Sequence, residues 1–301
     1  MQNIKNKLLV ILGPTASGKT DLSIKLAKKY NGAVVSADSR QVYKGMDIGS
    51  GKITKKEMQG IPHFLLDVAN PKRRFSVAQY QKLALKAIKN IQKQGKLPIL
   101  VGGTGFYIQS IVDGIVAPEV KPDWKLRKIL EKKSNEELYK MLLEKDPKRA
   151  KNIDKNNPRR LVRAVEIVLA TGKPVPPLLS GFPAEGGPAS GWDVLQIGML
   201  KTRQELEKNI NKRLLKRLQK DAIIKEVKKL RKNLSFKRLE EFGLEYKFVA
   251  QYLQGKISKQ EMMERIQKES EHYAKRQMTW FKRDKRINWI KNYKEAEKLV
   301  K

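Results

Sequence analysis

Residues 13–20 read Gly-Pro-Thr-Ala-Ser-Gly-Lys-Thr, which is the G-x4-G-K-[ST] pattern of a phosphate-binding loop. An apolar run, 8–12, precedes this stretch, and a helical pattern of apolar residues begins at Leu22. In such a strand–loop–helix setting, backbone N–H groups point at a phosphate, Lys19 adds a positive charge, and the Thr20 hydroxyl can bind Mg2+. A glycine-rich turn without a ligand would leave Lys19 beside a helix N-terminus, where a cation is unfavourable. The stretch therefore predicts an oligophosphate site.

The sequence has no strong match to the second metal-binding element of ATP-hydrolysing proteins. A typical P-loop NTPase has a strand that ends in an aspartate, which helps to hold the metal. Here the apolar strand 97–101 is followed by Gly-Gly-Thr, residues 102–104, and the short run 64–66 before Asp67 is a weak substitute. The pattern indicates a phosphate cradle without ATPase machinery.

Short apolar runs alternate with helical stretches, such as residues 76–94, in the first part of the chain. Apolar runs bounded by turns or helices are typical of buried strands. Strands that alternate with helices predict a parallel sheet with right-handed crossovers, with the ligand at the carboxyl ends of the strands. The runs expected to form strands are 8–12, 33–36, 63–68 and 97–101.

The rest of the chain predicts a helical insertion within one α/β core. Residues 121–171 are charged and helical in pattern, 172–191 are rich in proline and glycine, and 194–200 return as a strand. After Thr202 the pattern is helical almost to the end. The expected fold class is α/β, a P-loop NTPase-like parallel sheet flanked by helices. Its core comprises 1–120 and 192–301 with a helical C-terminal part, and the all-helical insertion comprises 121–191.

Composition narrows the class of protein and of partner. The chain has 301 residues, of which 40% are hydrophobic, and no cysteine, which excludes disulfides and cysteine metal sites and fits a cytoplasmic location. It contains no run of about 18 apolar residues, so we expect no membrane association. The net charge of +34 favours nucleic acid as a partner. The charge is spread along the chain, so part of it could simply solvate the surface.

A second polar segment follows a predicted strand. Residues 37–43 read Ala-Asp-Ser-Arg-Gln-Val-Tyr directly after the apolar run 33–36, which places them near the phosphate loop. A carboxylate with hydroxyl, guanidinium and amide neighbours can bind the polar edge of a base and accept a proton. Alternatively, Asp38 or Ser39 caps the next helix. From these residues alone both interpretations stay open.

At this point the chain resembles the tRNA dimethylallyltransferase (tRNA isopentenyltransferase, or IPP transferase) family over nearly its whole length. The phosphate loop alone is widespread, but the ordered set of motifs is highly specific. The motifs that carry the resemblance are 13–20, 37–43, 47–49 with Lys52, 97–105 with Tyr107, 159–163 with Glu166, Thr171-Gly172, and 274–281.

The resemblance implies that the exocyclic amine of the adenosine 3′ to the anticodon attacks dimethylallyl diphosphate and that diphosphate leaves. Asp38 then accepts the proton, while Lys19, Mg2+ on Thr20 and the loop amides stabilise the leaving diphosphate. Thr15 resembles the family's threonine near the bond that breaks. The expected catalytic residues are thus Asp38, Thr15 and Lys19. The expected diphosphate contacts are Gly13, Pro14, Thr15, Ala16, Ser17, Gly18, Lys19, Thr20 and Arg213.

The resemblance also implies contacts with the tRNA anticodon stem-loop. Three of the expected arginines, Arg159, Arg160 and Arg163, could instead form a solvated helix face paired with Glu166, since their spacing fits either role. Lys275, Arg276 and Trp280 combine cations with an aromatic ring and suit RNA, or else belong to a helix docked on the core. The expected tRNA contacts are Asp38, Ser39, Arg40, Gln41, Thr104, Arg127, Arg159, Arg160, Leu161, Val162 and Arg163.

The chain departs from the family in its C-terminal half, where Asn209 replaces a usual arginine and Arg213 remains the better candidate for the diphosphate. Two rival functions remain: an adenine-nucleotide prenyltransferase, and a basic P-loop kinase or RNA-binding NTPase. The charge excess favours tRNA over a free nucleotide, and the missing aspartate disfavours an NTPase. We expect a monomeric, cytoplasmic enzyme.

Overall fold

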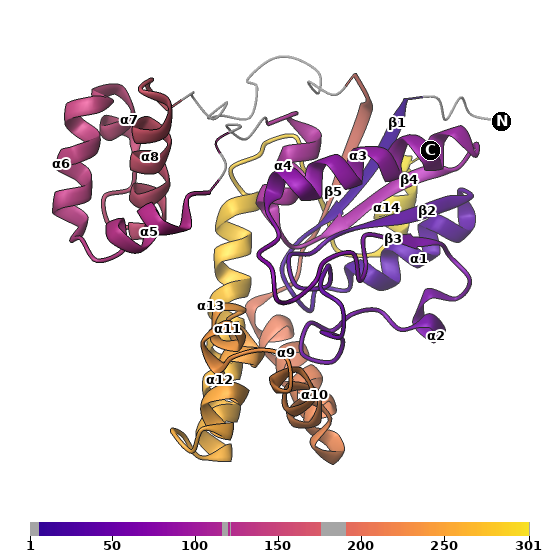
Figure 1. The fold of residues 1–301 in the computed structure, drawn as a ribbon. Helices are drawn as coiled ribbons and strands as arrows, with labels where there is room; N and C mark the ends of the chain where they lie inside the picture. The colour runs from indigo at the N-terminus through magenta and orange to yellow at the C-terminus, as the bar shows by residue number, and fades with distance from the viewer. Residues whose placement is uncertain (1–5, 116–119, 121, 176–190, 301) are drawn as a thin grey trace. The chain divides into compact units, whose positions relative to one another are not determined.

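The core of the protein is a six-stranded parallel sheet with strand order β3-β2-β4-β1-β5-β6. The computed structural model describes residues 6–115, 120, 122–175 and 191–300. The predicted α/β fold class is confirmed (Figure 1). The strands are β1 (Lys7–Leu12), β2 (Gly32–Ala37), β3 (His63–Phe64), β4 (Leu97–Gly102), β5 (Asp193–Met199) and β6 (Asn288–Ile290).

Helices account for most of the remaining described chain, and several begin with a side-chain cap. Ser76, for example, accepts a hydrogen bond from the backbone of Gln79, whose side chain returns to Ser76, so two free N–H groups are satisfied. The helices are α1 (Lys19–Lys29), α2 (Lys55–Met58), α3 (Val77–Lys93), α4 (Gly105–Val112), α5 (Trp124–Leu130), α6 (Asn135–Lys145), α7 (Pro147–Asn152), α8 (Pro158–Thr171), α9 (Arg203–Leu218), η1 (Gln219–Asp221), α10 (Ala222–Arg231), α11 (Phe236–Glu241), α12 (Leu244–Leu253), α13 (Lys259–Phe281) and α14 (Tyr293–Val300).

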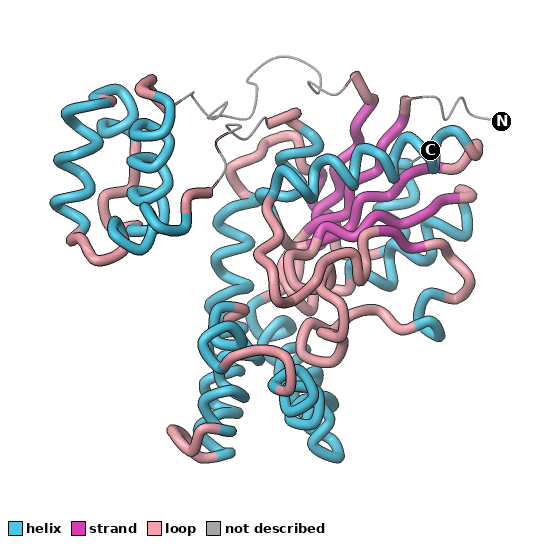
Figure 2. The backbone as a smooth tube through the Cα atoms, viewed as in Figure 1, coloured by secondary structure: helices cyan, strands magenta, loops and turns pink. Residues whose placement is uncertain are grey.

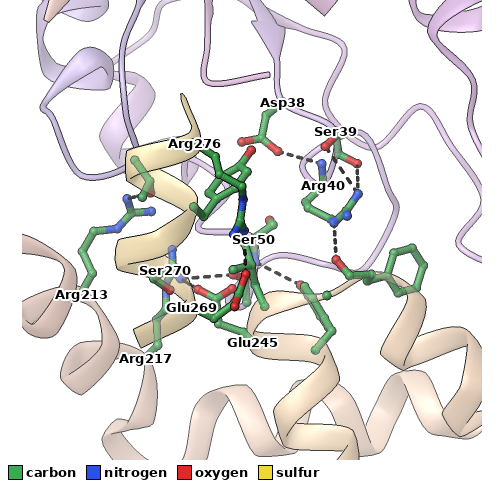
Figure 3. Close-up of a pocket in the computed structure, with 17 residues that line it drawn as sticks. Asp38, Ser39, Arg40, Ser50, Arg213, Arg217, Glu245, Glu269, Ser270 and Arg276 are labelled. Atoms are coloured by element: carbon green, nitrogen blue, oxygen red, sulfur yellow. Dashed lines mark hydrogen bonds and ion pairs between the residues drawn. The ribbon is translucent and has the colours of Figure 1, made fainter. Parts of the chain in front are cut away.

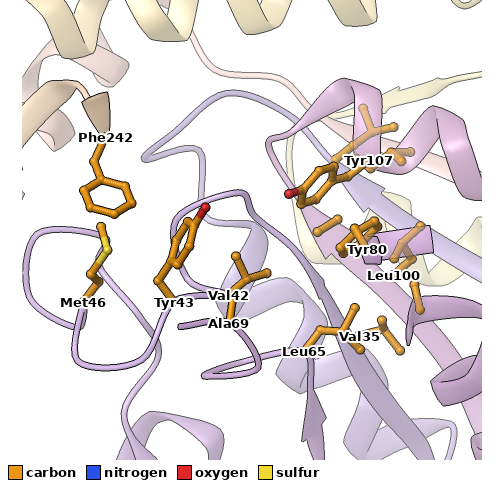
Figure 4. Packing of buried hydrophobic residues seen from close by; sticks show 14 of the residues in the cluster. Val35, Val42, Tyr43, Met46, Leu65, Ala69, Tyr80, Leu100, Tyr107 and Phe242 are labelled. Atoms are coloured by element: carbon orange, nitrogen blue, oxygen red, sulfur yellow. The ribbon is translucent and has the colours of Figure 1, made fainter. Parts of the chain in front are cut away.

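Helices cover both faces of the sheet. Successive side chains of a strand point to opposite sides, so each strand contributes to two apolar clusters. In β1, Leu9 and Ile11 pack in one cluster with residues of α1 and α14. Leu8, Val10 and Leu12 belong to the other cluster, with residues of α3 and α4. Figure 4 shows part of this second cluster, which continues beyond the sheet to Tyr43 and Phe242.

Two strands differ from the sequence prediction. The predicted strand 63–68 ends after Phe64, because Leu65 and Asp67 have positive φ angles of 65° and 57°, and such left-handed backbone cannot continue a strand. Strand β6 was not predicted, since only three residues pair with β5 at the edge of the sheet. So short a run carries no periodic signal.

The loops that follow the strands lie beside the C-terminal helices. Figure 2 shows loops gathered between the strands and helices α9–α12. Hydrogen bonds join Ala16 to Asn209 and Thr15 to both Arg213 and Gln277. The carboxyl edge of the sheet, where parallel sheets bind ligands, therefore faces side chains of α9 and α13.

The chain divides into two compact units, residues 1–114 with 185–301, and residues 115–184. The second unit contains α5–α8 around its own apolar core, which includes Leu130, Leu142, Leu161 and Val165. The predicted loop 172–191 lies outside the described residues between 176 and 190. No described helix is long and apolar enough to cross a membrane.

Candidate active site

The phosphate loop has the backbone of an anion cradle. Gly13 and Gly18 have φ angles of 143° and 93°, and Ala16 also has a positive φ of 62°. Gly18 is the N-cap of α1 and supplies no side-chain cap, so the helix start is open to an anion. The Ser17 hydroxyl is buried and has no partner among the described residues, as a donor reserved for a ligand would be.

Two cations converge on this loop without a carboxylate partner among the described residues. Lys19 Nζ donates to the Pro14 carbonyl at 2.6 Å, and Arg213 Nη1 donates to Thr15 Oγ1 at 3.1 Å. Burial, with the nearby charge of Arg213, lowers the pKa of Lys19 to about 7. Burial, with the charge of Arg217, lowers the pKa of Arg213 to about 10. The loop therefore lacks negative charge, which a diphosphate would supply.

Two amide side chains hold the loop in place. Gln277 Oε1 accepts from Thr15 N at 2.8 Å, and Gln277 Nε2 donates to the Gly103 carbonyl at 2.8 Å. Asn209 Nδ2 donates to the Ala16 carbonyl at 3.1 Å. Asn209 thus contacts the backbone of the loop where the family usually has a cation. Gln277 is a positioning residue that the sequence reasoning missed, although it lies inside the motif 274–281.

Asp38 follows β2 and caps no helix, because the next helix, α2, begins at Lys55 and has Thr54 as its N-cap. Its Oδ1 accepts from Arg40 N at 2.7 Å and from Gln41 N at 3.2 Å, which is a local side-chain turn. Ser39 N donates to Thr104 Oγ1 at 3.0 Å, so the ends of β2 and β4 meet. Figure 3 shows Asp38 at the cavity with Ser39 and Arg40 beside it.

A cavity of about 280 Å³ connects these groups within the α/β unit. Thr15, Asp38 and Arg213 line it together with Arg217 and Tyr273. Burial, with the negative charge of Asp38, raises the pKa of Tyr273 to about 12, so its phenol stays protonated at neutral pH. Arg217 and Tyr273 were not predicted as site residues, because nothing in their local sequence shows which helix face meets the cavity.

The remaining residues of the segment after β2 are held by the protein itself. Arg40 lines the cavity, and its Nε donates to the Phe242 carbonyl at 2.6 Å. Gln41 Nε2 donates to the Gly51 carbonyl at 3.2 Å. These bonds fix the backbone around Asp38. Arg276, which the sequence suggested for RNA, also lines the cavity and pairs with Glu269 at 2.6 Å.

In the helical unit the predicted arginines fall into two groups. Arg127 and Arg163 bind the carboxylate of Glu166, at 2.7 and 2.6 Å. Glu166 is fully buried; burial acts to raise its pKa, but the two arginines outweigh this and hold the pKa below its ordinary value. Arg159 and Arg160 are exposed. Leu161 and Val162 lie in the apolar core, so their side chains support the helix rather than face solvent.

A model of the IPP transferase family matches residues 41–284. The chain belongs to this family. A tRNA dimethylallyltransferase of Caldanaerobacter subterraneus subsp. tengcongensis is 42% identical, over 97% of this chain and 95% of the relative. One of Acetivibrio thermocellus is also 42% identical, over 98% and 96%.

Solved structures of IPP transferase relatives share the fold. The full-length tRNA isopentenylpyrophosphate transferase from Bacillus halodurans is 36% identical with a TM-score of 0.71, and the match covers 98% of this chain and 94% of that one. A eukaryotic dimethylallyltransferase acting on tRNA is 27% identical with a TM-score of 0.80, over 98% and 77%. The predicted family and the predicted class of enzyme, a transferase, are confirmed.

The donor set of this IPP transferase fits a cation only together with phosphate oxygens. The described residues contain no group of three or more His, Cys, Asp or Glu side chains that could hold a metal. Thr20, in the first turn of α1, is exposed beside the cradle. One protein hydroxyl with substrate phosphates and waters is a set that Mg2+ accepts.

Proposed function

We propose that this enzyme transfers a dimethylallyl group from dimethylallyl diphosphate to the N6 amine of the adenosine 3′ to the anticodon of tRNA. Membership of the IPP transferase family and the names of the relatives support the reaction. The observation that carries it is one cavity lined by both Asp38, at the end of β2, and Thr15 of the phosphate loop. A base and a diphosphate cradle share that cavity.

The donor diphosphate binds residues 13–20, with Lys19 and Arg213 supplying positive charge. Thr20 would hold Mg2+ together with phosphate oxygens of the donor. When bound, Mg2+ neutralises charge that builds on the leaving diphosphate. Thr15 Oγ1 already accepts from Arg213, so the hydroxyl and the guanidinium reach the diphosphate as one preformed unit.

The transfer is a substitution at the carbon that carries the diphosphate. The N6–carbon bond forms as the carbon–oxygen bond breaks, and the diphosphate leaves with the electron pair. The amine proton passes to the Asp38 carboxylate, because a base that removes it as the new bond forms makes a weak aryl amine a better nucleophile. Backbone N–H groups of Arg40 and Gln41 hold Asp38 Oδ1 and so orient the carboxylate.

The tRNA presents its anticodon stem-loop, and the target base leaves the stack to reach the cavity. Ser39, Arg40, Gln41 and Thr104 surround the base that receives the prenyl group. In the helical unit, exposed Arg159 and Arg160 bind phosphates, while Arg127 and Arg163 keep that helix in shape through Glu166. One chain carries every group this reaction needs, so we propose a monomer, and the tRNA substrate implies the cytoplasm.

Labelled dimethylallyl diphosphate, offered in parallel with tRNA, AMP and ATP, tests the proposal. We expect label on tRNA alone, and no transfer to a tRNA whose target adenosine is replaced. Label on AMP or ATP would instead show an adenine-nucleotide prenyltransferase. Hydrolysis of ATP without tRNA and without prenyl transfer would show an NTPase and overturn the proposal.

A further inference from the structure

A single carboxylate binds three consecutive backbone N–H groups of the segment 47–51. Glu226, on α10, accepts from Asp47 N at 2.8 Å, from Ile48 N at 2.6 Å and from Gly49 N at 3.0 Å. Consecutive N–H groups that point to one spot form a concave anion site. Here the anion is a side chain from a distant part of the sequence, so the contact fixes the backbone of this segment, which we call the 47–51 loop.

Tyr246 extends the same contact. Its hydroxyl donates to Glu226 Oε1 at 2.9 Å and accepts from Ser50 N at 3.1 Å. The Tyr246 side chain is only 1% exposed. A Cβ built on Gly49 would lie 2.6 Å from its ring, so the loop packs directly on the phenol. Two side chains thus occupy four successive N–H groups.

The other side of the 47–51 loop meets two arginines that line the cavity, Arg213 and Arg217, of which Arg217 also pairs with Glu245. The Gly49 carbonyl accepts from Arg217 Nη1 at 3.2 Å. A Cβ on Gly51 would overlap the guanidinium groups of both Arg213 and Arg217. Gly49, Arg213 and Arg217 all line the cavity. The position of this backbone therefore limits where the two guanidinium groups can lie.

We propose that Glu226 and Tyr246 are positioning residues for the donor site, which hold the 47–51 loop so that Arg213 and Arg217 face the diphosphate. The inference rests on the proposed function, because it assigns the donor to this cavity. Neither residue contacts the diphosphate; both act through the backbone of the loop. Loss of either contact moves the guanidinium groups and weakens donor binding while the base and the tRNA contacts stay in place.

The test compares Glu226→Gln, Glu226→Ala and Tyr246→Phe with wild type in steady-state prenyl transfer. We expect KM for dimethylallyl diphosphate, and the inhibition constant of inorganic diphosphate, to rise by about 2- to 30-fold, the range for coupling through a contact network. KM for tRNA should change by less than about twofold, below that range. A purely structural role would lower the melting temperature without this split between the two substrates.

Glu241→Gln is the matched control. Glu241, on the neighbouring helix α11, also ties a helix to a distant loop, through Arg74 at 3.0 Å and Arg238 at 2.8 Å, but neither of these partners lines the cavity, whereas Gly49 and Tyr246 do. Its variant should keep both KM values. An unchanged donor KM and diphosphate inhibition in folded Glu226→Ala or Tyr246→Phe would overturn the inference. A wild-type protein that does not prenylate tRNA would instead overturn the proposed function.

Discussion

The cations at the phosphate loop and those of the helical unit differ in their ion-pair partners and in their exposure to solvent. At the phosphate loop, Lys19 and Arg213 are partly buried and have no ion-pair partner among the described residues, and their pKa values are lowered to about 7 and about 10. In the helical unit, Arg127 and Arg163 share the buried Glu166, and Arg159 and Arg160 face solvent.

The difference separates structural charge from functional charge. A partly buried cation without a counterion is unfavourable until an anion binds. Lys19 and Arg213 therefore favour the binding of a polyanionic ligand. The buried carboxylate of Glu166 is already paired with two arginines, so this group needs no further ligand. Exposed arginines are fully solvated and contribute to binding mainly by displacing counterions. Each class predicts a different consequence of substitution.

The largest expected effect is at Asp38, the proposed proton acceptor that lines the cavity. Asp38→Asn keeps the oxygen that accepts from Arg40 and Gln41 but removes the proton acceptor, so the rate of prenyl transfer should fall about 10²- to 10⁴-fold. Donor and tRNA affinities should change little, as measured by single-turnover rates alongside equilibrium binding.

Asp21→Asn controls for the loss of one carboxylate near the phosphate loop, because Asp21 is exposed in the first turn of α1. It should keep the wild-type rate. An Asp38→Asn enzyme within about threefold of wild type, well below the usual loss of a general base, would remove Asp38 from the mechanism.

The segments 13–20 and 37–43 could be identified as candidate site segments from the sequence because each is one continuous motif. A glycine-rich turn between a strand and a helix, or a polar segment at a strand end, carries its meaning within a few residues. Glu226 and Gln277 could not be found in this way. Their bonds to Ile48 and Thr15 span 178 and 262 residues, and only the folded chain brings these groups together.

The strands show the same contrast between local and distant contacts. Strands β1, β2, β4 and β5 are mostly apolar and lie between clear breaks, so their alternation with helices predicts the parallel sheet. Strand β6 pairs through Asn288, Trp289 and Ile290, a run too short and too mixed to be recognised. Likewise, the spacing in α8 allows Arg159, Arg160 and Arg163 to pair with Glu166, but does not show that Arg163 does so while Arg159 and Arg160 stay exposed.

The second effect separates stability from chemistry. Glu166→Gln removes the negative charge between Arg127 and Arg163, so each of these partly buried cations loses its ion pair with Glu166. The free energy of unfolding of the helical unit should fall by about 2–3 kcal/mol, below the range for a fully buried pair because both arginines reach solvent. Chemical denaturation measures the loss. Donor KM should be unchanged; a donor defect without loss of stability would contradict the assignment.

The third effect is a pH dependence that comes from Lys19 of the phosphate loop. Free Lys19 has a pKa of about 7, and a bound diphosphate holds the ammonium charged, so binding above pH 7 takes up a proton. Affinity for dimethylallyl diphosphate should therefore fall by up to about tenfold per pH unit above about 7 through this group. Calorimetric titrations of wild type and Lys19→Met isolate it, since the variant should lose that part of the slope. Parallel slopes would show that Lys19 stays protonated in the free protein.

The smallest effect concerns the exposed arginines. A contact with a phosphate of single-stranded RNA adds about 0.7 to the salt slope of log affinity. If Arg159 and Arg160 each make one such contact, Arg159→Gln/Arg160→Gln should flatten the slope by about 1.4. The loss of tRNA affinity between about 50 and 200 mM salt should then be about sevenfold smaller.

Lys294→Gln/Lys298→Gln removes the same charge from α14 of the α/β unit and should leave the slope unchanged. Equal flattening in both variants would mean that tRNA senses only the net charge of +34. No flattening in the arginine variant would mean that Arg159 and Arg160 are only solvated and do not contact tRNA. Of the two groups of cations compared, only those at the phosphate loop would then bind a substrate.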